Sequence, residues 1–179
     1  MNATMNTTTD DRNAVTAASL HRQPAIAGAA QSERERVVTA GMTLGKGFKS
    51  TTPYIPGRRV FFKYRDLGVK AATNGRMRAN KMTSIDSMTQ PTGWHYHLCE
   101  MQFVYWLKGE SVLEFEDGTV GTFREGDALL IPGGMRHNEI FISGDHEALE
   151  VSVPGEIGTV ACERPEGLPD QLTPIASDL

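Results

Sequence analysis

Three histidines and one glutamine carry the clearest chemical signal in this sequence. His95 and His97 stand two residues apart, Gln102 follows five residues after His97, and His137 comes after a proline- and glycine-containing turn. Successive side chains of a β-strand point to opposite faces, so two histidines at this spacing point the same way. Imidazole is a common ligand of zinc, copper, iron and nickel. The pattern predicts one metal ion shared by these histidines, provided that a later strand returns beside the first.

The position of Gln102 constrains the backbone. The first two histidines are odd-numbered, so one continuous strand would place the even-numbered glutamine on the opposite face. These side chains share a face only if the chain turns or bulges between residues 98 and 101. After such a break, Val104 and Trp106 lie on the Gln102 face and line the interior. The apolar residues between them face outward, which predicts a cover from the N-terminal arm or a second subunit: Phe103, Tyr105 and Leu107.

Short apolar runs of strand length, separated by turn signals, begin at Arg58. The dipeptide Asp117-Gly118 between two such runs is a strong hairpin signal. Many short strands at close, regular spacing indicate a β-sandwich or barrel, and no long helical period separates them as in a βαβ fold. The predicted strands are residues 58–66, 76–85, 94–97, 101–108, 111–116, 119–123, 127–132, 138–142 and 148–153.

Composition divides the chain into three parts. Residues 1–32 have few large apolar side chains and residues 41–57 are rich in glycine and proline, so we expect residues 1–57 to form a flexible tail and arm. Residues 58–154 hold the predicted strands and form one β-barrel domain, because the chain shows no internal repeat. Residues 155–179 are expected to be an irregular C-terminal tail.

The overall composition excludes several classes of partner. The chain has 179 residues, enough for one domain with a core, and a formal net charge of −4. Without a basic stripe to neutralise phosphates, nucleic acid is not an expected partner. The sequence shows no membrane-spanning apolar run and no secretory signal. Its two cysteines are too few for a disulfide framework. We expect a cytoplasmic protein with reduced thiols.

The segments 93–109 (GWHYHLCEMQFVYWLKG) and 126–138 (GDALLIPGGMRHN) resemble the paired motifs of the cupin superfamily. Gln102 stands where the longer form of the first motif has a glutamate. The second motif is matched at four positions: Gly126, Pro132, Gly134 and His137. The sequence departs from the family pattern at three places: the amide at Gln102, Gly93 only two residues before His95, and Phe141 at the terminal asparagine position.

The resemblance implies an all-β fold, the cupin double-stranded β-helix or jelly-roll barrel. It also implies one divalent metal ion held by His95, His97, Gln102 and His137, with zinc, iron and nickel left open. Such a set is similar to that of cupin cyclases of aromatic polyketide biosynthesis, and to that of cupin dioxygenases that cleave quercetin or diketones. A homodimer is a further expectation from the family.

Several side chains near these motifs have two interpretations. Gln102 is either a metal ligand or a hydrogen-bond partner of a ligand histidine. Trp106 either packs in the core or stacks on a substrate, and Arg78 either holds a substrate carboxylate or lies on a solvated edge. His146 falls in a turn and is expected to be solvated. These alternatives leave Trp106 and Arg78 as the candidate substrate-binding residues.

The predicted chemistry follows from the neutral amide at Gln102. Three imidazoles and an amide leave the full positive charge on a divalent ion, which makes it a stronger Lewis acid and disfavours a ferric state. The sequence therefore predicts a metal-dependent enzyme acting on a small oxygenated organic molecule in the barrel, either a dioxygenase or a cyclase or isomerase. The alternative is a barrel that binds or senses a small molecule without catalysis.

Overall fold

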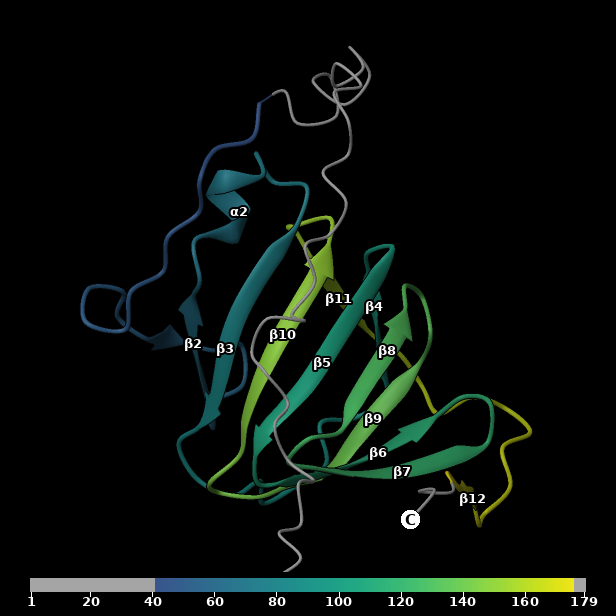
Figure 1. Ribbon diagram of the computed structural model, residues 1–179. Helices are drawn as coiled ribbons and strands as arrows, with labels where there is room; N and C mark the ends of the chain where they lie inside the picture. Colours follow the sequence, from purple (N-terminus) through teal and green to yellow (C-terminus); the bar gives the residue numbers. More distant parts are fainter. Residues whose placement is uncertain (1–40, 176–179) are drawn as a thin grey trace, which may run out of the picture. The chain divides into compact units, whose positions relative to one another are not determined.

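Two six-stranded sheets form the framework of the part that the computed structural model describes, residues 41–175 (Figure 1). The predicted tail over residues 1–40 and the last four residues lie outside it. The first sheet has the order β1 (Ile55–Pro56), β2 (Phe62–Asp66), β3 (Arg78–Ser84), β10 (Glu147–Val153), β5 (Met101–Lys108) and β8 (Ala128–Pro132). The second has the order β11 (Gly158–Ala161), β4 (His95–Leu98), β9 (His137–Ile142), β6 (Glu110–Phe115), β7 (Thr119–Arg124) and β12 (Thr173–Pro174).

This architecture confirms the all-β jelly-roll prediction. A single short helix, α2 (Val69–Ala72), interrupts the strands of the described chain, between β2 and β3. All strand pairs are antiparallel except β7 and β12, which are parallel. Strands that neighbour one another in a sheet are often distant in sequence, as β3 and β10 are. Such connections place the two predicted motif segments beside each other.

The core lies between the two sheets, on the inward face of each alternating strand. On β5, Gln102, Val104 and Trp106 are buried, whereas Tyr105 and Leu107 are exposed, as the alternation predicted. The indole of Trp106 stacks on Phe123 with ring centroids 4.7 Å apart. The rest of this cluster consists of Leu113, Phe115, Ile131 and Ala148. A second, smaller cluster consists of Phe62, Met88 and Ile142.

Two pairings extend the framework beyond the C-terminal end of the predicted barrel of residues 58–154. β11 and β12 lie in the segment 155–179 that the sequence predicted to be irregular, and β11 pairs with β4 in a register that sets Thr159 opposite His97. These strands have only four and two residues, so their sequence is too short to show alternation. Pairing with an existing sheet edge, and not local preference, defines them.

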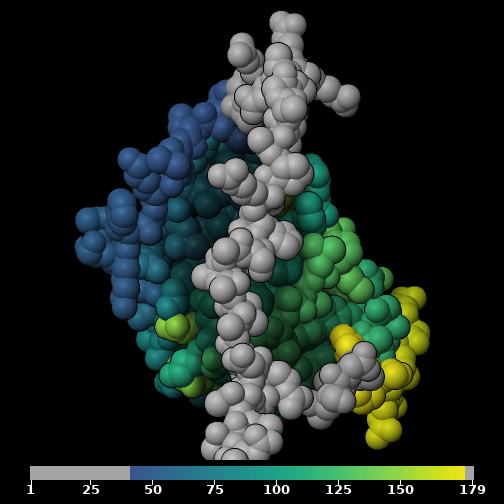
Figure 2. All heavy atoms as spheres, in the orientation of Figure 1, coloured from purple at the N-terminus to yellow at the C-terminus, as the bar shows by residue number. Residues whose placement is uncertain are grey.

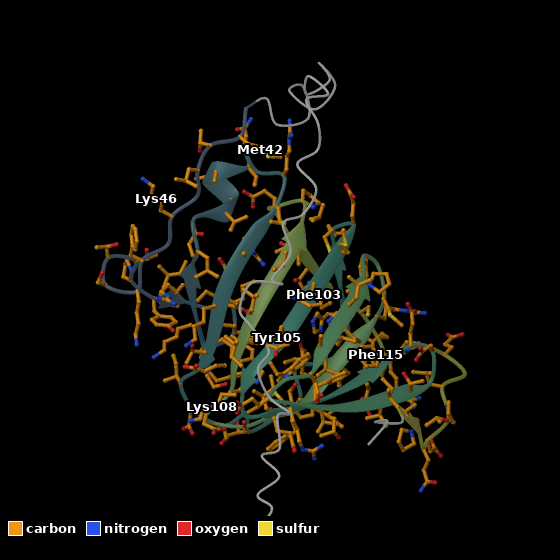
Figure 3. The ribbon with its side chains drawn as sticks, in the orientation of Figure 1. Met42, Lys46, Phe103, Tyr105, Lys108 and Phe115 are labelled. Atoms are coloured by element: carbon orange, nitrogen blue, oxygen red, sulfur yellow. The ribbon has the colours of Figure 1, made fainter. Side chains whose placement is uncertain are left out.

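The described part of the predicted arm, residues 41–57, contacts the domain. The backbone N–H of Thr43 donates to the carbonyl of Ala72 at 2.8 Å, and β1 pairs with β2. In Figure 2 the residues at the start of the described chain, in blue, lie on the left of the view, where Figure 1 shows β2. The outward face of β5 carries Phe103 and Tyr105 (Figure 3). Its cover, by the arm or by a second subunit, remains a prediction.

Candidate metal centre

Three imidazoles from two strands meet inside the barrel. His95 and His97 belong to β4, and His137 begins β9, where it is the direct antiparallel partner of His95. The ring centroids lie 4.4 Å apart for His95 and His137, 5.1 Å for His97 and His137, and 5.2 Å for His95 and His97. One ligand nitrogen from each ring lies within 4.8 Å of the other two. The structure thus brings together the three histidines predicted from their spacing.

A tight crossing holds the third histidine in place. After Leu98 the chain leaves the second sheet, and it enters the first sheet at Met101. The break predicted between residues 98 and 101, which lets Gln102 share a face with the histidines, is therefore a change of sheet. At this crossing the N–H of Gly133 donates to Glu100 O at 2.9 Å, and that of Gly134 donates to His97 O at 3.0 Å. The turn that precedes His137 is thereby fastened to the strand that carries His97.

Gly133 has no room for a side chain, because a Cβ there would lie 1.6 Å from the carbonyl oxygen of Cys99. We expect Gly133→Ala to lower the free energy of unfolding by about 3 kcal/mol or more, because two backbones must separate. Gly134→Ala is the matched control: its Cβ meets nothing within 4 Å but its φ is +81°, so strain of about 1–2 kcal/mol is expected. Urea unfolding of both variants measures the difference, and equal losses would contradict the packing explanation.

Hydrogen bonds fix the orientation of all three rings. His95 Nδ1 lies 2.8 Å from the carbonyl of Gly93, and His137 Nδ1 lies 3.0 Å from that of Met135. A carbonyl only accepts, so these Nδ1 atoms carry the proton and leave Nε2 with a lone pair. His97 Nδ1 lies 2.6 Å from the hydroxyl of Thr159 on β11. This is the arrangement that prepares imidazoles for a metal ion.

The donor set fits a divalent cation. For bonds of about 2 Å to each nitrogen, ligand nitrogens around a tetrahedral or octahedral ion are separated by about 3–3.5 Å. The nitrogens here lie within 4.8 Å, so small ring rotations suffice to close them on an ion. Burial lowers the pKa of His97 to about 4, with further lowering by His137 and His95, and burial also lowers the pKa of His137. Neutral imidazoles are the form that binds a metal.

Gln102 approaches the same cavity from the other sheet. Its side chain is buried, its Nε2 donates to Glu150 Oε2 at 3.1 Å, and its Oε1 has no hydrogen-bond partner among the described residues. An unpaired buried carbonyl oxygen is costly, and a cation or a ligand donor offsets that cost. The amide nitrogen of Gln102 binds Glu150, so the amide oxygen Oε1 is available as a fourth metal donor. Its role as a ligand stays a prediction.

Gln102→Glu tests this arrangement. The change removes the Nε2 donor and sets a second carboxylate against buried Glu150, whose pKa burial already raises despite its ion pair with Arg78. We expect the metal-free protein to lose about 2 kcal/mol of unfolding free energy. The double variant Gln102→Glu with Glu150→Gln exchanges donor and acceptor and should recover part of the loss. A single variant as stable as the parent in urea unfolding would contradict the observed contact.

A carboxylate that the sequence analysis missed lies beside the histidines. Glu139 Oε2 is 3.7 Å from His95 Nε2, and it accepts a short hydrogen bond from the hydroxyl of Thr92. Burial alone would raise the pKa of Glu139, but the charges of His95 and His137 and the Thr92 bond outweigh it and lower the pKa. The alternation of His137 and Glu139 on one strand was the signal available in the sequence. A register shift on β9 then turns Ile142 inward and Phe141 outward.

A cavity of about 300 Å³ opens beside these groups. Both predicted substrate-binding residues line it: Trp106, whose Nε1 is already bonded to Ser111 Oγ at 2.8 Å, and Arg78, whose guanidinium pairs with Glu150. Arg78 is therefore neither on a solvated edge nor a free partner for a substrate carboxylate. The sequence gives no signal for buried Glu150, because its neighbours Leu149 and Val151 are the apolar residues that alternation would place inward.

His146 contradicts the expectation of a solvated turn residue. Its side chain is 1% exposed, lines the cavity, and lies between Phe62 and Trp106, with ring centroids 6.4 and 6.3 Å away. Neither ring nitrogen has a hydrogen-bond partner among the described residues. Its position in a turn suggested a surface residue. The turn instead packs against Gly109, where a Cβ would lie 2.8 Å from the Cα of His146.

This burial predicts an acid sensitivity. Burial lowers the pKa of His146 from 6.5 to about 4, against small opposing effects of Asp145 and Glu147. Below pH 6.5 the unfolded chain binds a proton that the folded chain does not, so stability is lost as pH falls from 6.5 toward 4. His146→Gln should reduce the loss between pH 7 and pH 4 by about 3 kcal/mol. Urea unfolding with a chelator measures it, and identical pH dependences would contradict the assignment.

Comparisons with known proteins support the fold. The Cupin domain family matches residues 86–153. The polyketide cyclase RemF from Streptomyces resistomycificus is 18% identical, with a TM-score of 0.53 over 69% of this chain and 89% of its own. KdgF from Halomonas sp. is 16% identical, with a TM-score of 0.50 over 63% and 94%. Oxalate decarboxylase from Bacillus subtilis is 19% identical, with a TM-score of 0.51 over 67% and 32%.

No curated protein matches the sequence. In the described chain, no helix has the length and apolar character needed to cross a membrane. At identities below 20%, the likeness to these three structures shows a shared fold alone and says nothing about activity. The family match over residues 86–153, which include both motif segments, and the two-sheet barrel that carries them support a cupin superfamily protein.

Proposed function

We propose that this cupin is a metal-dependent enzyme that binds a small oxygen-bearing organic molecule in its barrel and moves a proton on it, in a cyclisation or isomerisation. The observation that supports this most is the carboxylate of Glu139, 3.7 Å from the free Nε2 of His95, on the wall of the cavity. His95, His97 and His137, with Gln102 Oε1 as a fourth donor, would hold the ion. When bound, a divalent ion supplies Lewis acidity toward a carbonyl, enol or phenol oxygen.

Glu139 is the proton acceptor in this proposal. A C–H bond next to a carbonyl group becomes acidic when the carbonyl oxygen is polarised, and a positioned carboxylate takes that proton. Thr92 donates to Glu139 Oε2 and orients the side chain. The carboxylate then returns the proton to a different atom of the same molecule, which completes an isomerisation or a ring closure without an external oxidant.

The cavity wall favours a neutral, partly apolar substrate. Val104, Trp106 and Ile131 provide an apolar surface, and the charge of Arg78 is compensated by Glu150. A substrate carboxylate would have to compete with that buried ion pair, at considerable cost. The name of RemF, a polyketide cyclase, agrees with this substrate class, although the likeness to RemF shows the fold alone.

Elemental analysis and an exchange assay test the proposal. Protein purified without added metal is analysed for zinc, iron and nickel, then incubated in D₂O with 1,3-diketones and hydroxynaphthalenes under argon. Metal-dependent deuterium incorporation next to the carbonyl, or an isomeric product, supports proton-transfer chemistry. Oxygen consumption under air without exchange under argon favours the dioxygenase alternative, and binding with neither reaction favours a non-catalytic binding protein.

We also propose that the protein acts as a homodimer. The outward face of the first sheet exposes Met101, Tyr105 and Leu107 on β5 and Leu130 on β8, all of them apolar. Contiguous apolar side chains on a sheet face favour association. Sedimentation equilibrium should give twice the chain mass, and a Leu107→Lys variant should shift the equilibrium toward the monomer.

A further inference from the structure

The cavity has a second polar group at a distance from the three histidines. Opposite Gln102 on β5 stands Ser152 on β10, and His146 precedes Ser152 by six residues on the same segment. Six extended residues correspond to roughly 20 Å of chain. Gln102, the three histidines and His146 all line the same cavity. His146 is therefore a polar group of the cavity wall that lies apart from the three-histidine cluster.

The surroundings of His146 are otherwise apolar. The ring of Phe62, a member of the second core cluster, lies 6.4 Å from the imidazole between centroids, and the indole of Trp106 stands edge-on to it. The nearby hydroxyl of Ser111 already accepts the Trp106 N–H. A 1% exposed imidazole with two unpaired nitrogens in such a place carries a desolvation cost that a hydrogen-bonding ligand would offset.

We propose that His146 binds the far end of the ligand, through a hydroxyl or carbonyl group carried on an aromatic body of about two rings. A neutral imidazole offers one donor and one acceptor, which matches a phenol or enol hydroxyl and not a carboxylate. The flat apolar walls of Trp106 and Phe62 suit an aromatic ring, and a volume of about 300 Å³ sets the size at the small end of ligand cavities. This inference deepens the proposed function and rests on its substrate class.

Two probes that differ by one hydroxyl test it: 2,7-dihydroxynaphthalene and 2-naphthol. The wild-type protein as isolated should bind the diol about five- to tenfold more tightly, as one added hydrogen bond predicts. His146→Phe should remove this preference while keeping the affinity for 2-naphthol, and His146→Gln, with its own donor and acceptor, should retain part of it. Isothermal titration calorimetry measures all six dissociation constants. An unchanged preference in His146→Phe overturns the proposal, as does a wild type that binds neither probe.

A second measurement does not depend on the variants folding. Wild-type protein labelled with ¹⁵N-histidine is titrated with each probe. The diol should shift the ring nitrogen signals of His146, and 2-naphthol should leave these signals unchanged. Absence of a shift overturns the proposal. Binding is read separately from turnover: diol preference without deuterium exchange would defeat the proposed proton-transfer function and leave the role of His146 intact.

Discussion

Metal binding should be lost when His137 is replaced by alanine. His137 is 1% exposed and is the direct strand partner of His95, so no other described side chain can take its position. Weakening the support of a metal ligand already costs 10–100-fold in affinity, so removing a ligand should cost at least about a hundredfold. Competition with a chromogenic chelator measures the affinity for zinc in the parent and in the variant.

Thermal unfolding gives an independent readout of the same change. Metal at a thousandfold excess over its dissociation constant stabilises the parent by about 4 kcal/mol, and a hundredfold weaker site forfeits about 2.7 kcal/mol of that. His146→Gln is the matched control, because it also removes a buried imidazole but leaves the three-histidine cluster complete. Equal metal affinity in His137→Ala and the parent would contradict a shared centre, and far-UV circular dichroism checks that the variant is folded.

The framework of the site was predictable because it depends on alternation. A period of two on β5 correctly assigned Val104 and Trp106 to the inside and Tyr105 and Leu107 to the outside. The same period joined His95 to His97, and the mismatch in parity required a break before Gln102. The structure turns that break into a change of sheet between Leu98 and Met101. Local pattern thus located the three histidines, which the structure places within 4.8 Å of one another.

The remaining parts of the site depend on tertiary contacts that no local pattern encodes. Glu150 points inward because Arg78, on the neighbouring strand, neutralises it, although the flanking apolar residues suggest the reverse. His146 is buried because its turn folds over the end of the barrel, and β11 exists because β4 offers an edge. In each case a partner far away in sequence outweighs the preference of the segment itself.

Glu139→Gln should abolish the proposed proton transfer while leaving metal binding in place. The amide keeps the size of the side chain but has no basic oxygen to take a proton, so a loss of about 10²–10⁴-fold in turnover or exchange rate is expected. Glu139 is a neighbour of His95 and not a member of the three-histidine group, so metal content and affinity should change little. Deuterium exchange in D₂O and elemental analysis measure the two quantities on one preparation.

Glu147→Gln is the matched control for this change. Glu147 also lies on a strand and pairs with a lysine, Lys81, at 2.7 Å, but it is absent from the cavity lining. It should exchange at the parental rate, because its carboxylate does not reach the ligand. Loss of metal together with activity in Glu139→Gln would instead make Glu139 a metal ligand, and full activity with full metal would exclude it as the proton acceptor. Measuring the exchange rate and the metal content separately therefore decides whether Glu139 is a proton acceptor or a metal ligand.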